Sequence, residues 1–103
     1  MKTVQPAERR RSVRQECFTA IAYATKSFSS IEYIRDISAW GVFIRTTKQI
    51  PVGEDITMTI PKPGSNSSIK IIGEVVRNSP NGIGVKFKMG IDESVIKPIT
   101  ENA

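Results

Sequence analysis

The sequence predicts an all-β fold, a small six-stranded antiparallel β-barrel with a flexible basic arm before it and a short helix near its C-terminus. The chain has 103 residues, which is enough for about one domain with one modest core. Six short segments rich in β-branched and aromatic residues are separated by turn signals, and helical periodicity is almost absent. Closing such strands into a barrel removes the exposed edges that a small sheet would otherwise present.

Residues 1–14 are expected to form the flexible arm, and residues 15–103 the barrel domain. The charged residues of the arm are Lys2, Glu8, Arg9, Arg10, Arg11 and Arg14. The formal net charge of the whole chain is +5, so the arm carries most of it. Surfaces that bind nucleic acid usually spread Lys and Arg over a whole face. The asymmetry therefore favours an arm that binds a small anion, and a nucleic-acid partner is the less favoured interpretation.

The first two strands are expected to pair as a hairpin. Residues 17–25 alternate in character, with Ile21 and Tyr23 on one side and alanines on the other, as in a half-buried strand. Serines within residues 27–30 indicate a turn. Residues 31–37 then supply the β-branched and aromatic side chains of the second strand, which ends at an Asp-x-Ser segment.

Four more strands are predicted, at residues 41–46, 55–60, 69–78 and 83–88. Turn residues separate them, because Gly, Pro, Asn and Ser cluster at 51–54, 61–66 and 79–82. The fifth strand is long enough to need a bend, for which Gly73 is the expected site. In the sixth strand Ile83, Val85 and Phe87 share one face, as expected for an antiparallel sheet with one buried side.

A short helix is predicted after the last strand. Asp92 can cap a helix over residues 93–97, and Pro98 is expected to limit how far that helix continues. Met58, Met89 and Phe43 are expected to be core or barrel-end residues.

The composition excludes several classes of function. The chain has no histidine, and Cys17 is its one cysteine, so the common zinc sites and the Ser/His or Cys/His catalytic arrangements cannot be assembled. We therefore expect no enzyme, no metal site and no internal disulfide. No apolar run approaches the roughly 18 residues of a membrane span, and no signal-peptide core is present. These features predict a cytoplasmic protein without membrane insertion.

Two motifs supply complementary chemistry for a guanine nucleotide. An Arg-x-x-x-Arg pair is formed by Arg10 and Arg14, and an Asp-x-Ser-x-x-Gly motif by Asp36, Ser38 and Gly41. A guanidinium donates paired hydrogen bonds to phosphate oxygens or to the O6/N7 edge of guanine. A carboxylate can accept hydrogen bonds from N1 and N2 of the same base. Together the motifs predict a site that reads both the anionic and the base portions of a nucleotide.

The order and spacing of these motifs resemble the signature of the PilZ domain family. Ile-Pro-Val-Gly at residues 50–53 and Gly-Ile-Gly-Val-Lys-Phe at 82–87 add to the resemblance, which covers about residues 8–90. The resemblance implies a six-stranded barrel that binds cyclic di-GMP on its outer surface, with the arginine segment folding over the nucleotide. It assigns Arg10 and Arg14 to phosphates and a guanine edge, and Arg9 is expected to add a contact.

The resemblance further assigns Asp36 to the Watson–Crick edge of a guanine and Ser38 to a phosphate or a base. Both residues could instead satisfy backbone amides in a strand-ending turn, and the two roles can coexist. Gly41 would permit close approach of the ligand or a positive φ. Trp40 stands where the family commonly has a small residue, and packing or a rim position is favoured over stacking on a base. Arg35 is expected to pair with Asp36 or with solvent, on the opposite face of its strand.

The favoured functional hypothesis is a cyclic di-GMP receptor whose arm closes over the nucleotide and so changes a surface that contacts a protein effector. The alternative is a PilZ-like interaction scaffold that does not bind cyclic di-GMP and acts in motility or pilus assembly. Non-specific nucleic-acid binding through the arm is a third hypothesis, which predicts strong salt dependence.

Overall fold

The computed structural model describes residues 15–16, 19–62 and 66–101. The predicted arm, with Arg9, Arg10 and Arg14, lies outside the described residues, and so does Cys17. The described elements are β1 (Gln15–Glu16), β2 (Ala20–Ala24), β3 (Ser29–Ile37), β4 (Gly41–Arg45), β5 (Asp55–Pro61), β6 (Ser68–Ser79), β7 (Gly82–Phe87) and α2 (Glu93–Glu101).

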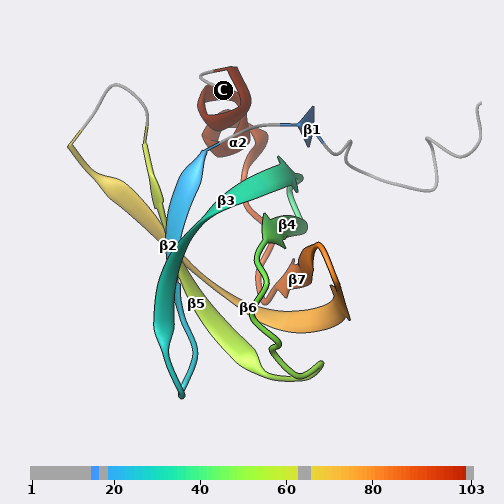
Figure 1. The fold of residues 1–103 in the computed structure, drawn as a ribbon. Coiled ribbons are helices and arrows are strands. Elements are labelled where there is room, and N and C mark those ends of the chain that lie inside the picture. The colour runs from blue at the N-terminus through green and yellow to red at the C-terminus, as the bar shows by residue number, and fades with distance from the viewer. Residues whose placement is uncertain (1–14, 17–18, 63–65, 102–103) are drawn as a thin grey trace, which may run out of the picture.

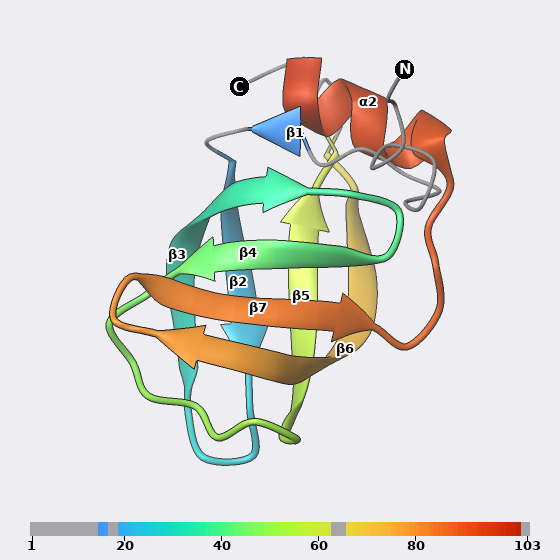
Figure 2. The ribbon, with the colours of Figure 1, turned by 90° about the vertical axis from the view of Figure 1, so that its right-hand side faces the viewer.

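The predicted six-stranded antiparallel barrel is confirmed (Figures 1 and 2). The strands follow the order β3-β2-β5-β6-β7-β4, and β4 pairs back onto β3 to close the cylinder. The expected hairpin of the first two strands is the β2–β3 pair, in which Ala22 lies opposite Ile31. Its turn is shorter than expected, because Ser29 and Ser30 already belong to β3. The short strand β1 adds to the end of β3 and was not predicted.

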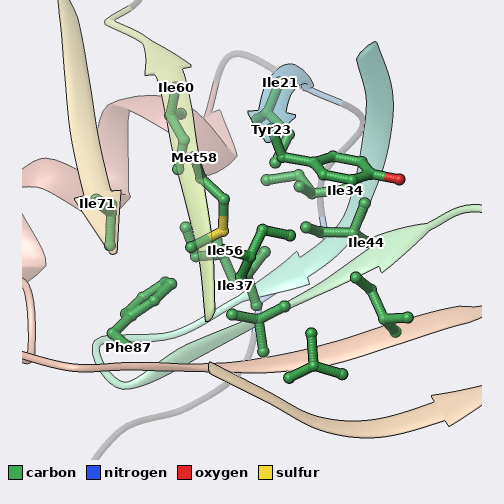
Figure 3. Packing of buried hydrophobic residues seen from close by; sticks show 14 of the residues in the cluster. Ile21, Tyr23, Ile34, Ile37, Ile44, Ile56, Met58, Ile60, Ile71 and Phe87 are labelled. Atoms are coloured by element: carbon green, nitrogen blue, oxygen red, sulfur yellow. The ribbon is translucent and has the colours of Figure 1, made fainter. Parts of the chain in front are cut away.

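One hydrophobic core fills the barrel (Figure 3). The alternation predicted from the sequence is confirmed in β2, where Ile21 and Tyr23 are buried and Ala22 and Ala24 are exposed. The largest fully buried side chains are Tyr23, Phe87, Ile21, Ile34, Ile37, Ile44, Ile50, Ile56, Met58, Ile60, Ile83 and Ile96. Burying each such side chain stabilises the fold by about 1.5–3 kcal/mol.

The three residues expected in the core or at a barrel end differ in their positions. Met58 is fully buried in the core, and Phe43 is 3% exposed but lies outside the central cluster. Met89 is 77% exposed, so a core position is wrong for it. The last barrel strand ends at Phe87, and the inward alternation that would bury Met89 ends with it.

The long strand β6 curves around the barrel, as Figure 2 shows, and pairs with β5 and then with β7. Its irregularity in pairing falls between Val75 and Arg77, not at Gly73 as expected. Gly73 keeps regular register with both neighbouring strands, opposite Ile56 and Phe87. A Cβ at Gly73 would lie 2.5 Å from Cγ1 of Val85, so close packing accounts for this glycine.

The helix α2 lies at one end of the barrel, beside the short strand β1 (Figure 2). It continues through Pro98 to Glu101, so the expectation that Pro98 would limit it is wrong. A proline inside a helix costs about 3 kcal/mol or more. Ile96 and Ile99 are both fully buried against the barrel core, and their burial contributes a comparable amount. Tertiary packing thus offsets the unfavourable effect of proline on the helix.

Among the described residues, no helix has the length and apolar character that a bilayer span requires.

Asp92 caps α2 as predicted, and this contact has a testable pH dependence. The Ser94 amide donates to Oδ1 of Asp92 at 2.9 Å, and this hydrogen bond holds the pKa of Asp92 below its ordinary value. A lowered folded-state pKa contributes stability above the unfolded pKa, about 3.9, and the contribution is lost as the pH falls through the folded value. Thermal unfolding should therefore show a steeper acid loss of stability for the wild type than for Asp92→Asn, whose cap does not titrate. Parallel acid profiles would contradict this role.

Candidate functional site

A β-bulge in β3 shapes the candidate site. Ile34 lies opposite Ile44, but Asp36 lies opposite Phe43, so Arg35 is the extra residue on its strand. Simple alternation predicted that Arg35 and Asp36 would face opposite sides. This prediction is wrong, because the bulge turns both residues toward one cleft on the outer surface of the barrel.

The cleft has a volume of about 510 Å³ and draws its walls from strands that are far apart in the sequence. Its lining residues are Arg35, Asp36, Trp40, Gly41, Val76, Arg77, Gly84, Val85 and Lys86. Asp36 and Gly41 of the predicted motif are thus brought together in one cleft.

The carboxylate of Asp36 is held in place at the cleft. Nε of Arg35 donates to Oδ2 of Asp36 at 2.9 Å, which confirms the predicted pairing. The Asp36 side chain is only 11% exposed, whereas the Arg35 side chain is 44% exposed. The short strand β1 runs beside this point, with Glu16 in register opposite Asp36. A mostly buried carboxylate oriented by a guanidinium is suited to accept hydrogen bonds in a fixed direction.

Ser38 builds the turn between β3 and β4. Its hydroxyl donates to the Gly41 carbonyl at 3.5 Å and accepts from the Trp40 amide at 3.3 Å. The Ser38 amide also donates to the Gly41 carbonyl, at 2.9 Å. Ser38 is 3% exposed and is not among the residues that line the cleft. The turn role that the sequence suggested is therefore present, and a ligand contact through Ser38 stays a prediction.

Gly41 is required by the close approach of two backbones. A Cβ at this position would lie 2.6 Å from the carbonyl oxygen of Val85, where β4 passes β7. The sequence offered a positive φ as the other explanation for this glycine. Within the described residues the glycines with positive φ are Gly53 and Gly82, so Gly41 does not have one.

Gly41→Ala is expected to destabilise the protein by about 1–3 kcal/mol, as overpacking against rigid backbone does. Gly84→Ala is the matched control on the neighbouring strand, because the three atoms nearest to its Cβ would be side-chain atoms of Arg77, at 3.5 Å or more. Denaturant unfolding without any ligand measures both variants. Equal midpoints would contradict a packing role for Gly41.

Two arginines that line the cleft pack against the buried ring of Phe43. Phe43 points outward from β4, and the guanidinium carbons of Arg35 and Arg77 lie 4.0 and 5.7 Å from its ring centroid. Arg77 also lies across Gly84, which faces Phe43 in register. Cation–π contacts of this kind hold guanidinium groups at a defined position. Together with Lys86, these arginines make the cleft cationic around one carboxylate.

Sequence analysis did not identify Arg77 and Lys86 as members of the site. The outward alternation of Gly84 and Lys86 in the last strand was visible in the sequence. The proximity of Gly84 and Lys86 to β4 depends on how β4 and β7 pair when the barrel closes. In that pairing Gly41 lies opposite Lys86, and Phe43 lies opposite Gly84. No local pattern specifies that register.

Trp40 stands at the rim of the cleft, as favoured from the sequence. The residue is 48% exposed and lines the cleft. A Cβ placed on Gly90 would lie 2.7 Å from Cζ3 of the indole, so the ring rests against the bare backbone of Gly90.

A second hollow, of about 780 Å³, lies elsewhere on the barrel, by Lys26, Gly53 and Asp55. It contains no residue of either motif. In the described part of the chain, no group of three or more acidic, cysteine or histidine residues is placed to hold a metal ion. The first cleft is therefore the candidate site.

Comparison with models of protein families identifies a family for this chain. The model of the PilZ domain matches residues 8–101, a range that includes both motifs and the whole barrel. No curated protein matches the chain.

Proposed function

The chain belongs to the PilZ domain family, and on that premise we propose that it is a receptor for cyclic di-GMP in bacterial second-messenger signalling. Membership of the family supports the general assignment as a receptor, since PilZ domains are non-catalytic receptor domains known for binding cyclic di-GMP. The binding site proposed for this chain is the cleft around Asp36, closed by the arginine arm.

The observation that carries the proposal is the juxtaposition of Asp36 with cationic side chains in one cleft. Cyclic di-GMP presents two phosphates and two guanines. Guanidinium and ammonium groups are suited to the phosphates, whereas a carboxylate is suited to the N1 and N2 hydrogens of guanine. Asp36, already oriented by Arg35, takes the guanine edge in this proposal.

The arginine arm is connected to this cleft by the chain itself. Arg14 precedes Gln15, which pairs with β3 opposite Ile37, one residue from Asp36. An extended chain spans at most about 3.6 Å per residue, so Arg10 is tethered within about 18 Å of Gln15. We propose that Arg9, Arg10 and Arg14 bind the phosphates and a guanine edge when the arm closes.

Closure of the arm over the nucleotide would let the receptor signal binding to another protein. Ordering a segment over a ligand creates a new surface from the segment and its surroundings. We propose that this surface is recognised by a protein effector in the cytoplasm.

Titration calorimetry of the whole chain with cyclic di-GMP tests the proposal. A saturable heat of binding, with no comparable heat from cyclic di-AMP, is expected. Absence of binding at high micromolar cyclic di-GMP would contradict the receptor function and would favour the scaffold alternative. Equal binding of a mixed oligonucleotide, lost at high salt, would instead favour non-specific nucleic-acid binding.

A further inference from the structure

We propose that Trp40 is the base-stacking wall of the cleft and that Gly90 is the residue that holds its ring in position. The inference rests on the proposed cyclic nucleotide site and specifies how that site distinguishes a base-bearing ligand from a simple anion. It assigns a direct ligand contact to a residue for which sequence analysis favoured packing or a rim position.

The amide and the carbonyl of Trp40 are both hydrogen-bonded. Its amide donates to the Ser38 hydroxyl at 3.3 Å, and its carbonyl accepts from the Phe87 amide at 2.8 Å. The neighbouring Ala39 carbonyl accepts from the Ile91 amide, also at 2.8 Å. The turn that carries the indole is thus bonded to the last residue of β7 and to the segment that follows it.

The indole ring has one supported side. A Cβ on Gly90 would lie 2.7, 2.8 and 3.0 Å from Cζ3, Cη2 and Cε3 of Trp40, so any side chain at position 90 would displace the ring. The φ of Gly90 is not positive, so the glycine is not required by backbone conformation. Its lack of a side chain serves the packing of the indole.

The rest of the ring is available to a ligand. Trp40 is 48% exposed and lines the cleft together with Asp36 and Lys86. The cleft keeps a volume of about 510 Å³ with the indole in place, so the ring forms a wall and does not fill the site. Pockets of about 300–1,000 Å³ are typical of small-ligand sites.

A flat, supported indole beside cationic groups is suited to a ligand that combines a planar base with phosphate. Stacking of a base on an aromatic side chain is worth about 5- to 150-fold in affinity when measured by alanine substitution. A phosphate ion alone would use the cationic groups and gain nothing from the ring. Trp40 should therefore contribute to the affinity for cyclic di-GMP and not to that for inorganic phosphate.

Trp40 is the one tryptophan in the sequence, so its fluorescence reports the proposed contact directly. Saturating cyclic di-GMP is expected to quench the emission of the wild type, and inorganic phosphate is not. In calorimetry, Trp40→Ala should weaken cyclic di-GMP binding about 5- to 150-fold, and Trp40→Phe should retain most of the affinity. Thermal unfolding confirms that each variant is folded.

Gly90→Ala provides a second, independent test, because it displaces the indole while leaving it in the chain. Weaker binding is expected for Gly90→Ala, and unchanged binding for Met89→Ala, an adjacent residue that is 77% exposed and outside the cleft. Equal or tighter binding by folded Trp40→Ala, or wild-type binding without a change in emission, would overturn the stacking role and leave the receptor function intact. Failure of the wild type to bind cyclic di-GMP would overturn both.

Discussion

Asp36→Ala is expected to weaken cyclic di-GMP binding by about 10- to 150-fold, the loss that follows removal of a charge-assisted hydrogen-bond acceptor. The Asp36 side chain is 11% exposed, and the Arg35 guanidinium orients its carboxylate at 2.9 Å. Asp36→Asn should lose part of the affinity as well, because an amide cannot accept from both N1 and N2 of guanine. Calorimetric titration of each variant measures the effect.

Asp55→Ala is the matched control for Asp36→Ala. Asp55 is also a strand carboxylate paired with a cation, Lys88 at 3.0 Å, but it lies outside the candidate cleft. This control should keep wild-type affinity, and thermal unfolding establishes that both variants are folded before their affinities are compared. Equal affinities for Asp36→Ala and Asp55→Ala would contradict the role of Asp36 in the site.

The double substitution of Arg10 and Arg14 by alanine is expected to have the largest effect on binding, a loss of about 100-fold or more. Each guanidinium is proposed to make charge-assisted contacts worth about 1.5–3 kcal/mol. Thermal unfolding without ligand shows whether the variant is folded. Calorimetry and thermal unfolding of the same sample separate a loss of binding from a loss of folding.

A change in net charge alone must be excluded for the arginine pair. Replacing Lys62 and Lys70 by alanine removes the same charge from exposed positions outside the cleft. This control should bind cyclic di-GMP nearly as well as the wild type at physiological salt, because exposed charges are screened beyond about 8 Å. Comparable losses in the two double variants would mean that the arm acts by general attraction and not by specific contacts.

The sequence was sufficient to predict the barrel because its strands alternate clearly. Ile21 and Tyr23 in β2, and Ile83, Val85 and Phe87 in β7, are buried as the period-two pattern requires. Turn residues at 51–54 were also identified, and there Gly53 adopts a φ of 99° while the Glu54 amide donates to the Pro51 carbonyl. Such features are local, so a single sequence contains them.

The structure differs from the predictions made from the sequence where packing between distant segments overrides a local rule. The bulge at Arg35 cannot be found from alternation, because alternation is the rule that a bulge breaks. Pro98 is tolerated in α2 because Ile96 and Ile99 are buried against the barrel. The inclusion of Arg77 in the site depends on closure between β4 and β7, which no local pattern determines.

The central claim is that the arginine arm and the Asp36 cleft form one site for cyclic di-GMP. Hydrogen exchange of the backbone amides, measured with and without the nucleotide, tests it most directly. Slower exchange is predicted in two segments at once, residues 9–14 of the arm and residues 36–41 at the cleft, and Asp36→Ala should abolish both changes. Nucleotide binding that leaves exchange in residues 9–14 unaltered would contradict the account.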